Sequence, residues 1–214
     1  MERISTSLML AGLCALVSVQ AAVGDDINPP PWRGQPGSTF GMWEYLTPDP
    51  HPQPDVGIYP YGLPTTTVTP GLFQAWMPVW GGQEGVWPLS GEILVNIPNR
   101  PEPLPYKDIW IQLTWAQQAP NVWPAVSEIR FGVPATLERQ IVLGPTGEVG
   151  GDGLWYHSTY SIRIMPNPDW EQILITGAVN VDELVIDTIC APEPATLGLI
   201  VLGGLAVLRR RHRA

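Results

Sequence analysis

A strict alternation of apolar and polar residues, with a period of two, constrains this chain more than any other feature of its sequence. Within residues 92–97, Ile93, Val95 and Ile97 stand on one side, and Glu92 and Asn96 stand on the other. Such alternation is typical of half-buried β-strands, because successive side chains of a strand point to opposite faces of its sheet. The same pattern occurs over residues 109–115, 125–133, 155–164 and 181–189.

The apolar side of each segment predicts which residues enter the core. Residues 171–179 are apolar on both sides, which predicts a strand near the centre of a sheet. In residues 125–133, the apolar side consists of Ile129, Phe131 and Val133. In the other segments the predicted core residues are Ile109, Ile111, Leu113, Trp115, Tyr156, Tyr160, Ile162, Ile164, Leu184 and Ile186.

The segments between the expected strands indicate the fold class. Helical periodicity is missing between the two termini, and turn sequences such as GPTGEVGGDG and MPNPDW separate the strands. We therefore expect an all-β fold, a jelly-roll-like β-sandwich in which one sheet exposes a polar and aromatic face. Residues 25–70 are dense in proline, but their aromatic residues favour an ordered irregular wrap over a disordered linker.

The first 24 residues have the layout of a secretory signal peptide. A basic residue precedes a short apolar run, and small residues follow, so we expect cleavage after Ala21 or Gly24. The apolar run is shorter than the about 20 residues that a membrane-spanning helix needs. The secreted domain is then expected to comprise residues 25–190, followed by a separate C-terminal segment at residues 191–214.

The charge of the chain limits its possible functions, and its cysteine content limits how the domain can be stabilised. The chain has a net charge of −9, and five of its eleven Lys and Arg residues lie in the terminal segments. This acidic body argues against nucleic-acid binding, which needs clustered basic side chains. Loss of Cys14 with the signal peptide leaves Cys190 without a partner, so we expect a domain that is stable without an internal disulfide.

Residue patterns of known catalytic sites are missing from the chain. His51, His157 and His212 stand apart, and no G-x-S-x-G, H-E-x-x-H, paired-cysteine or P-loop pattern occurs. We therefore expect neither an enzyme nor a cofactor. A polysaccharide-acting enzyme is the remote alternative, because acidic residues that could pair as in a glycosidase are plentiful.

Acidic residues near the end of the domain are candidate ligands for a Ca²⁺ ion. Carboxylate oxygens are ligands that Ca²⁺ prefers, but the spacing here matches no EF-hand loop. A solvated acidic edge is the alternative that we favour. The candidate residues are Asp152, Asp182, Glu183 and Asp187.

Two of the ten tryptophans are candidates for carbohydrate binding, because alternation places them opposite the apolar side of their strands. An exposed indole offers a flat apolar plate with a polar edge, which suits stacking against a sugar ring. The interpretation that we favour is that the proline-rich wrap simply covers this face. The candidate residues on the face are Trp110, Gln112, Thr114, Trp155, His157 and Arg163.

The C-terminal segment, residues 191–214, reads APEPATLGLIVLGGLAVLRRRHRA. As a helix, its apolar part at residues 195–208 would be about 21 Å long, at about 1.5 Å per residue. A hydrocarbon core is about 30 Å thick, so the segment is a marginal membrane anchor.

The three parts of this segment closely resemble the PEP-CTERM sorting signal, in which a Pro-Glu-Pro motif precedes a short transmembrane helix and an arginine cluster. The resemblance implies a substrate of an exosortase in a Gram-negative bacterium, anchored transiently in the membrane and then delivered to the cell surface or extracellular matrix. It also implies association with exopolysaccharide and biofilm. The matching residues are Pro192, Glu193, Pro194, Arg209, Arg210 and Arg211.

These observations lead us to expect a secreted, non-enzymatic exoprotein with a structural or adhesive role in the exopolysaccharide matrix. Its expected partners are the exosortase that processes it and matrix glycans. A lectin-like module that uses Trp110 and Trp155 is the main alternative.

Overall fold

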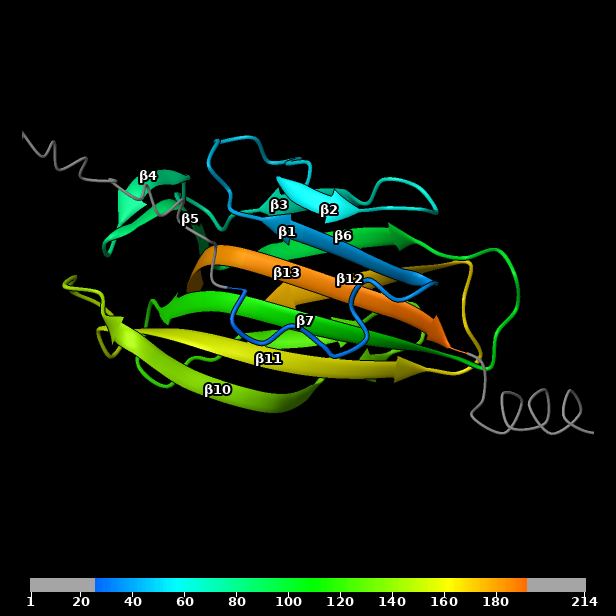
Figure 1. Ribbon diagram of the computed structural model, residues 1–214. Coiled ribbons are helices and arrows are strands. Elements are labelled where there is room, and N and C mark those ends of the chain that lie inside the picture. The colour runs from blue at the N-terminus through cyan, green and yellow to red at the C-terminus, as the bar shows by residue number, and fades with distance from the viewer. Residues whose placement is uncertain (1–25, 192–214) are drawn as a thin grey trace, which may run out of the picture.

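The computed structural model describes residues 26–191, and within them the chain forms thirteen β-strands and no helix (Figure 1). The predicted all-β class is therefore confirmed. The strands are β1 (Ser38–Trp43), β2 (Val56–Ile58), β3 (Thr65–Thr69), β4 (Met77–Trp80), β5 (Gln83–Leu89), β6 (Glu92–Pro98), β7 (Tyr106–Gln117), β8 (Ala125–Glu128), β9 (Val133–Pro134), β10 (Thr136–Pro145), β11 (Leu154–Ile164), β12 (Trp170–Thr176) and β13 (Val179–Ala191).

The strands form two antiparallel sheets that face each other (Figure 1). Sheet A has eight strands, with the order β10-β11-β7-β13-β1-β2, and the β4–β5 hairpin joins it through β5 and β13. Sheet B has the order β3-β6-β12-β8-β9. The expectation of a central strand at residues 171–179 is confirmed, because β12 pairs with β6 on one side and β8 on the other.

The hydrophobic core lies between the inner faces of the two sheets. The alternation predicted for residues 92–97 is confirmed, because Ile93, Val95 and Ile97 are all buried. From sheet A, the Trp115 ring stacks on Tyr156 with 4.9 Å between the ring centroids. All ten core residues predicted in the remaining segments are buried. Removal of this apolar surface from water is the main force that holds the sheets together.

The prediction for residues 125–133 is wrong in register. Strand β8 ends at Glu128, and Ile129 and Phe131 are exposed rather than buried. The buried Glu128 carboxylate instead accepts hydrogen bonds from the backbone N–H groups of Arg130 (3.3 Å) and Phe131 (2.9 Å). The Glu128 side chain thus binds the backbone N–H groups of the turn that ends β8. The alternation predicts that the strand continues at this position.

The proline-rich residues 25–70 are ordered over their described part, as predicted, but they are less irregular than expected. They contain β1, β2 and β3, and β1 pairs with β13 along its whole length, from Ser38 opposite Ile189 to Trp43 opposite Leu184. Residues 26–37, which precede β1, form an irregular segment that we call the cover segment. Proline therefore limits where the strands begin and end but does not exclude them.

A buried ion pair joins the two sheets at one end of the core. The Lys107 Nζ on β7 lies 3.0 Å from Oε1 of Glu171 on β12, and both side chains are fully buried. The thiol of Cys190 is also buried nearby on β13, where Cys190 is paired with Lys107. Its Sγ donates to Oδ1 of Asn167, and it forms no disulfide.

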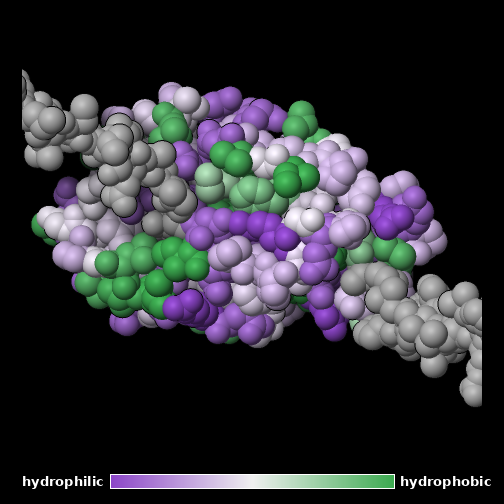
Figure 2. Space-filling model, in the orientation of Figure 1, coloured by the Kyte–Doolittle hydropathy of each residue, from purple (hydrophilic) through white to green (hydrophobic). Residues whose placement is uncertain are grey.

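Hydrophobic side chains on the front of sheet A gather at its free edge. Figure 2 shows this patch at the lower left, where β10 ends. Val142 and Leu143 of β10 are exposed, at a register shift in the β10–β11 pairing. Such bulges are common on edge strands.

The signal peptide predicted at residues 1–24 and the helix predicted within residues 191–214 lie outside the described residues. Within the part of the chain that the structure covers, no helix is long and apolar enough to cross a membrane.

Candidate glycan-binding site

The predicted site residues lie on two neighbouring strands of sheet A. In the β7–β11 pairing, Trp110 is opposite Ser161, and Gln112 is opposite Thr159. Each of these strands sends its other set of side chains into the core. The candidate residues therefore occupy the outer face of sheet A, as their alternation predicts.

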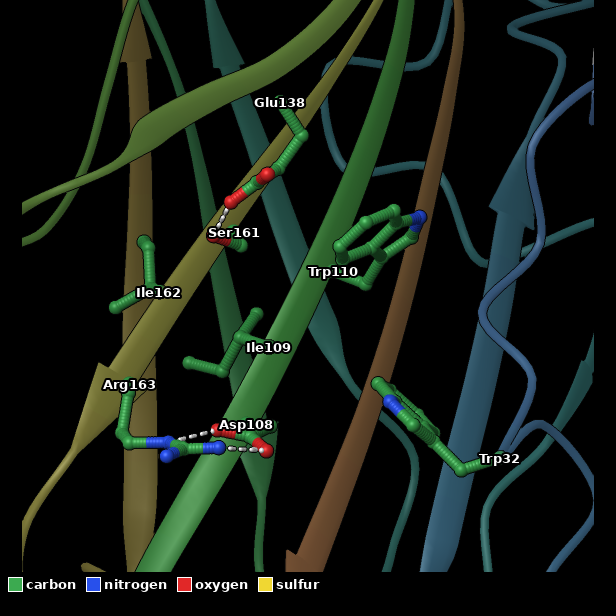
Figure 3. A pocket seen from close by; sticks show the side chains of 8 residues that line it. All are labelled: Trp32, Asp108, Ile109, Trp110, Glu138, Ser161, Ile162 and Arg163. Atoms are coloured by element: carbon green, nitrogen blue, oxygen red, sulfur yellow. Dashed lines mark hydrogen bonds and ion pairs between the residues drawn. The ribbon is translucent and has the colours of Figure 1, made fainter.

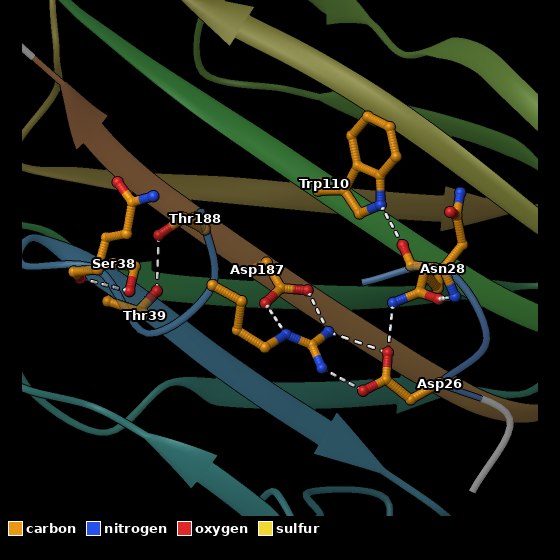
Figure 4. A network of polar contacts seen from close by, with 10 residues as sticks. Asp26, Asn28, Ser38, Thr39, Trp110, Asp187 and Thr188 are labelled. Carbon is orange, nitrogen blue, oxygen red and sulfur yellow. Dashed lines mark hydrogen bonds and ion pairs between the residues drawn. The ribbon is translucent and has the colours of Figure 1, made fainter. Parts of the chain in front are cut away.

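The cover segment lies across much of this outer face (Figure 4). The Gln112 amide donates to Asp26 Oδ1 (2.7 Å) and accepts the backbone N–H of Asn28 (2.7 Å). Gln112 is only 1% exposed as a result. The Asn28 side chain also donates to Thr159 (3.2 Å), and the Trp110 indole N–H donates to the Asn28 carbonyl (2.8 Å).

One arginine fastens the cover segment to the sheet. The Arg33 guanidinium donates to both carboxylate oxygens of Asp187 on β13, at 2.5 Å and 2.6 Å, and also pairs with Asp26. It lies over the Phe40 ring, 4.1 Å from the ring centroid. Burial raises the pKa of the Asp187 carboxyl to about 6, although Arg33 acts to lower it.

The expected exposure of Trp155 is wrong. Its indole is 3% exposed and donates to the Gly81 carbonyl (2.8 Å) in the turn between β4 and β5. The Trp80 ring packs edge-on against it, with 5.5 Å between centroids. The β4–β5 hairpin thus covers this end of the outer face, and alternation within β11 carries no information about that hairpin.

His157 and Thr114 are also buried on this face. Nδ1 of His157 lies 3.2 Å from the Thr114 hydroxyl, and the two residues are 2% and 1% exposed. Gln112, Thr114, Trp155 and His157 are therefore buried and cannot contact a ligand from solvent. Of the predicted residues, Trp110 and Arg163 remain together at an open pocket.

This pocket, which we call the Trp32–Trp110 pocket, has a volume of about 420 Å³ (Figure 3). Trp32 comes from the cover segment, and Trp110 comes from β7. Arg163 and Ser161 of β11 and Glu138 of β10 supply polar groups. A pocket with two indole rings and several hydrogen-bonding groups has the composition expected of a small-molecule or sugar site.

The polar side chains of the pocket are held in place by one another. Arg163 donates to both carboxylate oxygens of Asp108, at 2.6 Å and 2.8 Å, and lies 4.4 Å from the centroid of the Tyr106 ring. The Ser161 hydroxyl donates to Glu138 (2.5 Å). These pairs fix the positions of the groups that a ligand would meet.

The prediction missed Trp32, Asp108, Glu138 and Ser161 as parts of this pocket. Asp108 stands two residues before Trp110 and therefore on the same side of β7, so alternation contained the signal for it. Trp32 and Glu138 join the pocket only because the cover segment and β10 pack beside β7 and β11. No local pattern in the sequence indicates that contact.

The candidate Ca²⁺ ligands are not brought together. Asp187 pairs with Arg33, and Asp152 accepts the Tyr156 hydroxyl (2.5 Å) at the other end of β11. Asp182 and Glu183 lie at the register shift in the pairing of β13 with β7. Across residues 26–191, no group of three or more His, Cys, Asp or Glu side chains is arranged to hold a metal ion.

Comparison with known proteins gives a family match in the C-terminal segment. Residues 191–213 match the family model of the PEP-CTERM protein-sorting motif, so the resemblance in the sequence is confirmed. No curated protein and no solved structure matches the chain. The motif indicates a secreted protein that an exosortase sorts to the cell surface or extracellular space. The described all-β domain, residues 26–191, therefore ends where a PEP-CTERM sorting motif begins.

Proposed function

We propose that this protein is a non-enzymatic, adhesive component of the extracellular polysaccharide matrix, and that it binds glycan in the Trp32–Trp110 pocket. The sorting motif supports the location. The pocket supports the activity, because its two indoles and its polar side chains suit a sugar ring.

The single observation that carries the proposal is the meeting of two indoles in one open pocket. Trp32 and Trp110 lie far apart in the sequence, and both line a cavity that also contains Ser161 and Arg163. The apolar C–H faces of a sugar stack on indole rings, while its hydroxyl groups bond to charged and hydroxyl side chains.

The state of the pocket carboxylates favours binding over catalysis. A glycosidase needs one carboxyl group to donate a proton and a second to attack or to activate water. Asp108 accepts hydrogen bonds from two nitrogens of the Arg163 guanidinium, and Glu138 accepts one from the Ser161 hydroxyl. Both groups are better suited to orienting the pocket than to proton transfer.

The strand order supports the jelly-roll-like form of the body. Strands β1, β13, β7 and β11 lie side by side in sheet A, and β6, β12, β8 and β9 lie side by side in sheet B. The chain passes repeatedly between the two sheets, as it does in a Greek-key sandwich. On this proposal the body works outside the cell after the signal peptide and the C-terminal helix have been removed.

Binding of the processed protein to a glycan array and to exopolysaccharide from the bacterium that makes it tests the proposal. Trp32→Ala and Arg163→Ala should each weaken binding at least about tenfold, or about 1.4 kcal/mol. Phe73→Ala is the control, because Phe73 is fully exposed and lies outside the pocket. Absence of binding by the folded wild-type protein would exclude the glycan-binding function, and turnover of the polysaccharide would favour the enzyme instead.

The sorting part of the proposal has its own measurement. The intact mass of protein released from the cell surface should lack the apolar segment at residues 195–208 and the arginines that follow it. Full-length protein held permanently in the membrane would contradict transient anchoring.

A further inference from the structure

The opposite side of the sandwich has a second pocket, on the outer face of sheet B. Its volume is about 460 Å³, and we call it the Trp170 pocket. It shares no residue with the Trp32–Trp110 pocket. Its lining includes Leu63, Thr65, Asn96, Pro98, Asp169 and Trp170.

A row of polar side chains crosses three strands at this pocket. In the strand pairing, Asn96 of β6 lies opposite Thr65 of β3 on one side and opposite Gln172 of β12 on the other. The Gln172 amide donates to Asn96 Oδ1 (2.7 Å), and the Asn96 amide donates to the Thr65 hydroxyl (3.2 Å). Each amide NH₂ carries two N–H donors, and the row uses one of each.

An aromatic ring stands beside this row. Trp170 lies opposite Pro98 in the β12–β6 pairing, two positions before Gln172, and is 36% exposed. The Arg130 guanidinium lies over its ring, 3.9 Å from the centroid, and forms an ion pair with Asp169 (2.9 Å). These contacts hold the indole in place, so little side-chain entropy is lost when a ligand stacks on it.

The chemistry of the pocket fits a glycan better than an extended peptide. A peptide that adds to a sheet needs unpaired backbone groups at a sheet edge. Asn96 and Gln172 stand on β6 and β12, which both have strand neighbours on each side. A ligand over Asn96 and Gln172 must therefore be recognised by side chains, and a fixed indole beside amide and hydroxyl groups suits a sugar ring with its hydroxyls.

We propose that the Trp170 pocket is a second glycan-binding site, and that one molecule therefore links two polysaccharide chains. This inference rests on the glycan-binding function proposed for the first pocket. Because the two pockets lie on the outer faces of opposite sheets, a single chain segment cannot fill both, and a bound protein holds two chains on either side of the sandwich. Cross-links of this kind multiply the strength of attachment without any new contact.

Titration calorimetry with a short oligosaccharide, cut from the exopolysaccharide of the producing bacterium, counts the sites in the processed protein. The wild-type protein should bind two equivalents, and Trp170→Ala and Trp32→Ala should each bind one. Asn96→Ala is a second variant of the new site that leaves the indole in place, and it should weaken one of the two binding events at least about tenfold. Phe73→Ala should bind two equivalents, and near-ultraviolet circular dichroism checks that each variant is folded.

Light scattering from the intact exopolysaccharide measures cross-linking directly. The wild-type protein should raise scattering, whereas Trp170→Ala and Trp32→Ala should remain bound to the polysaccharide without raising it. Two equivalents bound by Trp170→Ala, together with wild-type affinity at both sites in Asn96→Ala, would overturn the second site and leave the first intact. Loss of one equivalent in Trp170→Ala, with no effect of Trp32→Ala, would instead overturn the first site. A wild-type protein that binds nothing would overturn both.

Discussion

Arg33 and Asp187 meet across the outer face of sheet A through two hydrogen bonds of 2.5 Å and 2.6 Å. The Asp187 carboxylate is fully buried, and Arg33 belongs to the irregular cover segment. This contact and the bonds of Asn28 and Asp26 to Gln112 hold the cover segment over much of the polar outer face, in agreement with the interpretation that the proline-rich segment covers it. The same segment brings Trp32 to the edge of the pocket.

Replacement of Arg33 should destabilise the domain. Arg33→Met leaves the Asp187 carboxylate buried without its partner, which costs about 3 kcal/mol in comparable cases. We expect a lower urea midpoint and faster proteolysis before residue 38, because the cover segment loses its attachment. Arg139→Met is the control, since Arg139 is exposed on the edge strand β10. Equal stability of the two variants would contradict the fastening role.

Stability should depend on the protonation of Asp187. Burial raises the pKa of its carboxyl from 3.8 to about 6 in the folded protein. The folded state therefore binds more protons than the unfolded state between about pH 4 and pH 6, and the stabilisation present below pH 4 is lost as the pH rises through 6. The loss should be about 2–3 kcal/mol, at about 1.36 kcal/mol for each pKa unit.

Asp187→Asn removes this titration and should flatten the profile of unfolding free energy against pH over that range. Urea denaturation at half-unit pH steps measures the profile. Asp49→Asn, on an exposed loop, should keep the wild-type slope. If the unfolding free energy of the wild-type protein rises from pH 4 to pH 6 relative to that of Asp187→Asn, the sign is opposite and the prediction is refuted.

The Lys107–Glu171 ion pair between the sheets should affect stability mainly because each buried charge needs the other as its partner. Lys107→Met leaves Glu171 buried alone and should cost about 3–5 kcal/mol at pH 8, where the carboxylate is ionised. Burial already raises the pKa of Glu171 to about 7, so the loss should be smaller at pH 5. The double variant Lys107→Met, Glu171→Leu should recover most of the stability, because apolar groups of similar size fill the space. A double variant that is no more stable than Lys107→Met would show that the charges are needed themselves.

Glu128→Ala should destabilise the end of β8. The Glu128 carboxylate accepts from the N–H groups of Arg130, Phe131 and Gln172, at 2.9–3.3 Å. Loss of this acceptor leaves the part-buried backbone N–H groups without a partner. An unpaired buried donor costs about 1–3 kcal/mol of stability, and the cost is larger where the lost partner was charged. Thermal unfolding measures the effect, with Ser127→Ala as the control, because Ser127 lies on the same strand and points to the other face. Identical melting temperatures for the two variants would refute the prediction.

The strands and most of the core were predictable from the sequence because both depend on neighbouring residues. Ile109, Ile111 and Leu113 alternate with Trp110 and Gln112, and all three are buried. The exception is residues 125–133, where apolar residues continue the alternation past the end of the strand. Glu128 breaks the pattern there, because its carboxylate is buried to bind backbone N–H groups of a turn.

The candidate site was predictable only in part. Alternation places Trp110, Trp155 and Arg163 on the outer face of sheet A, and the structure agrees on the face. The predicted exposure of Trp155 is wrong, since the β4–β5 hairpin covers that indole. The open polar row of Thr65, Asn96 and Gln172 lies on sheet B instead.

The sequence by itself determined the all-β class, the inward side of most strands and the sorting motif at residues 191–213, because each is written in residues that lie close together along the chain. Only the tertiary structure decided which outward faces meet water. Exposure depends on what packs over a strand, and here the covering groups, Arg33 and the Gly81 turn, come from segments distant in the sequence. Their positions follow from the packing of the whole domain, so no local pattern records them.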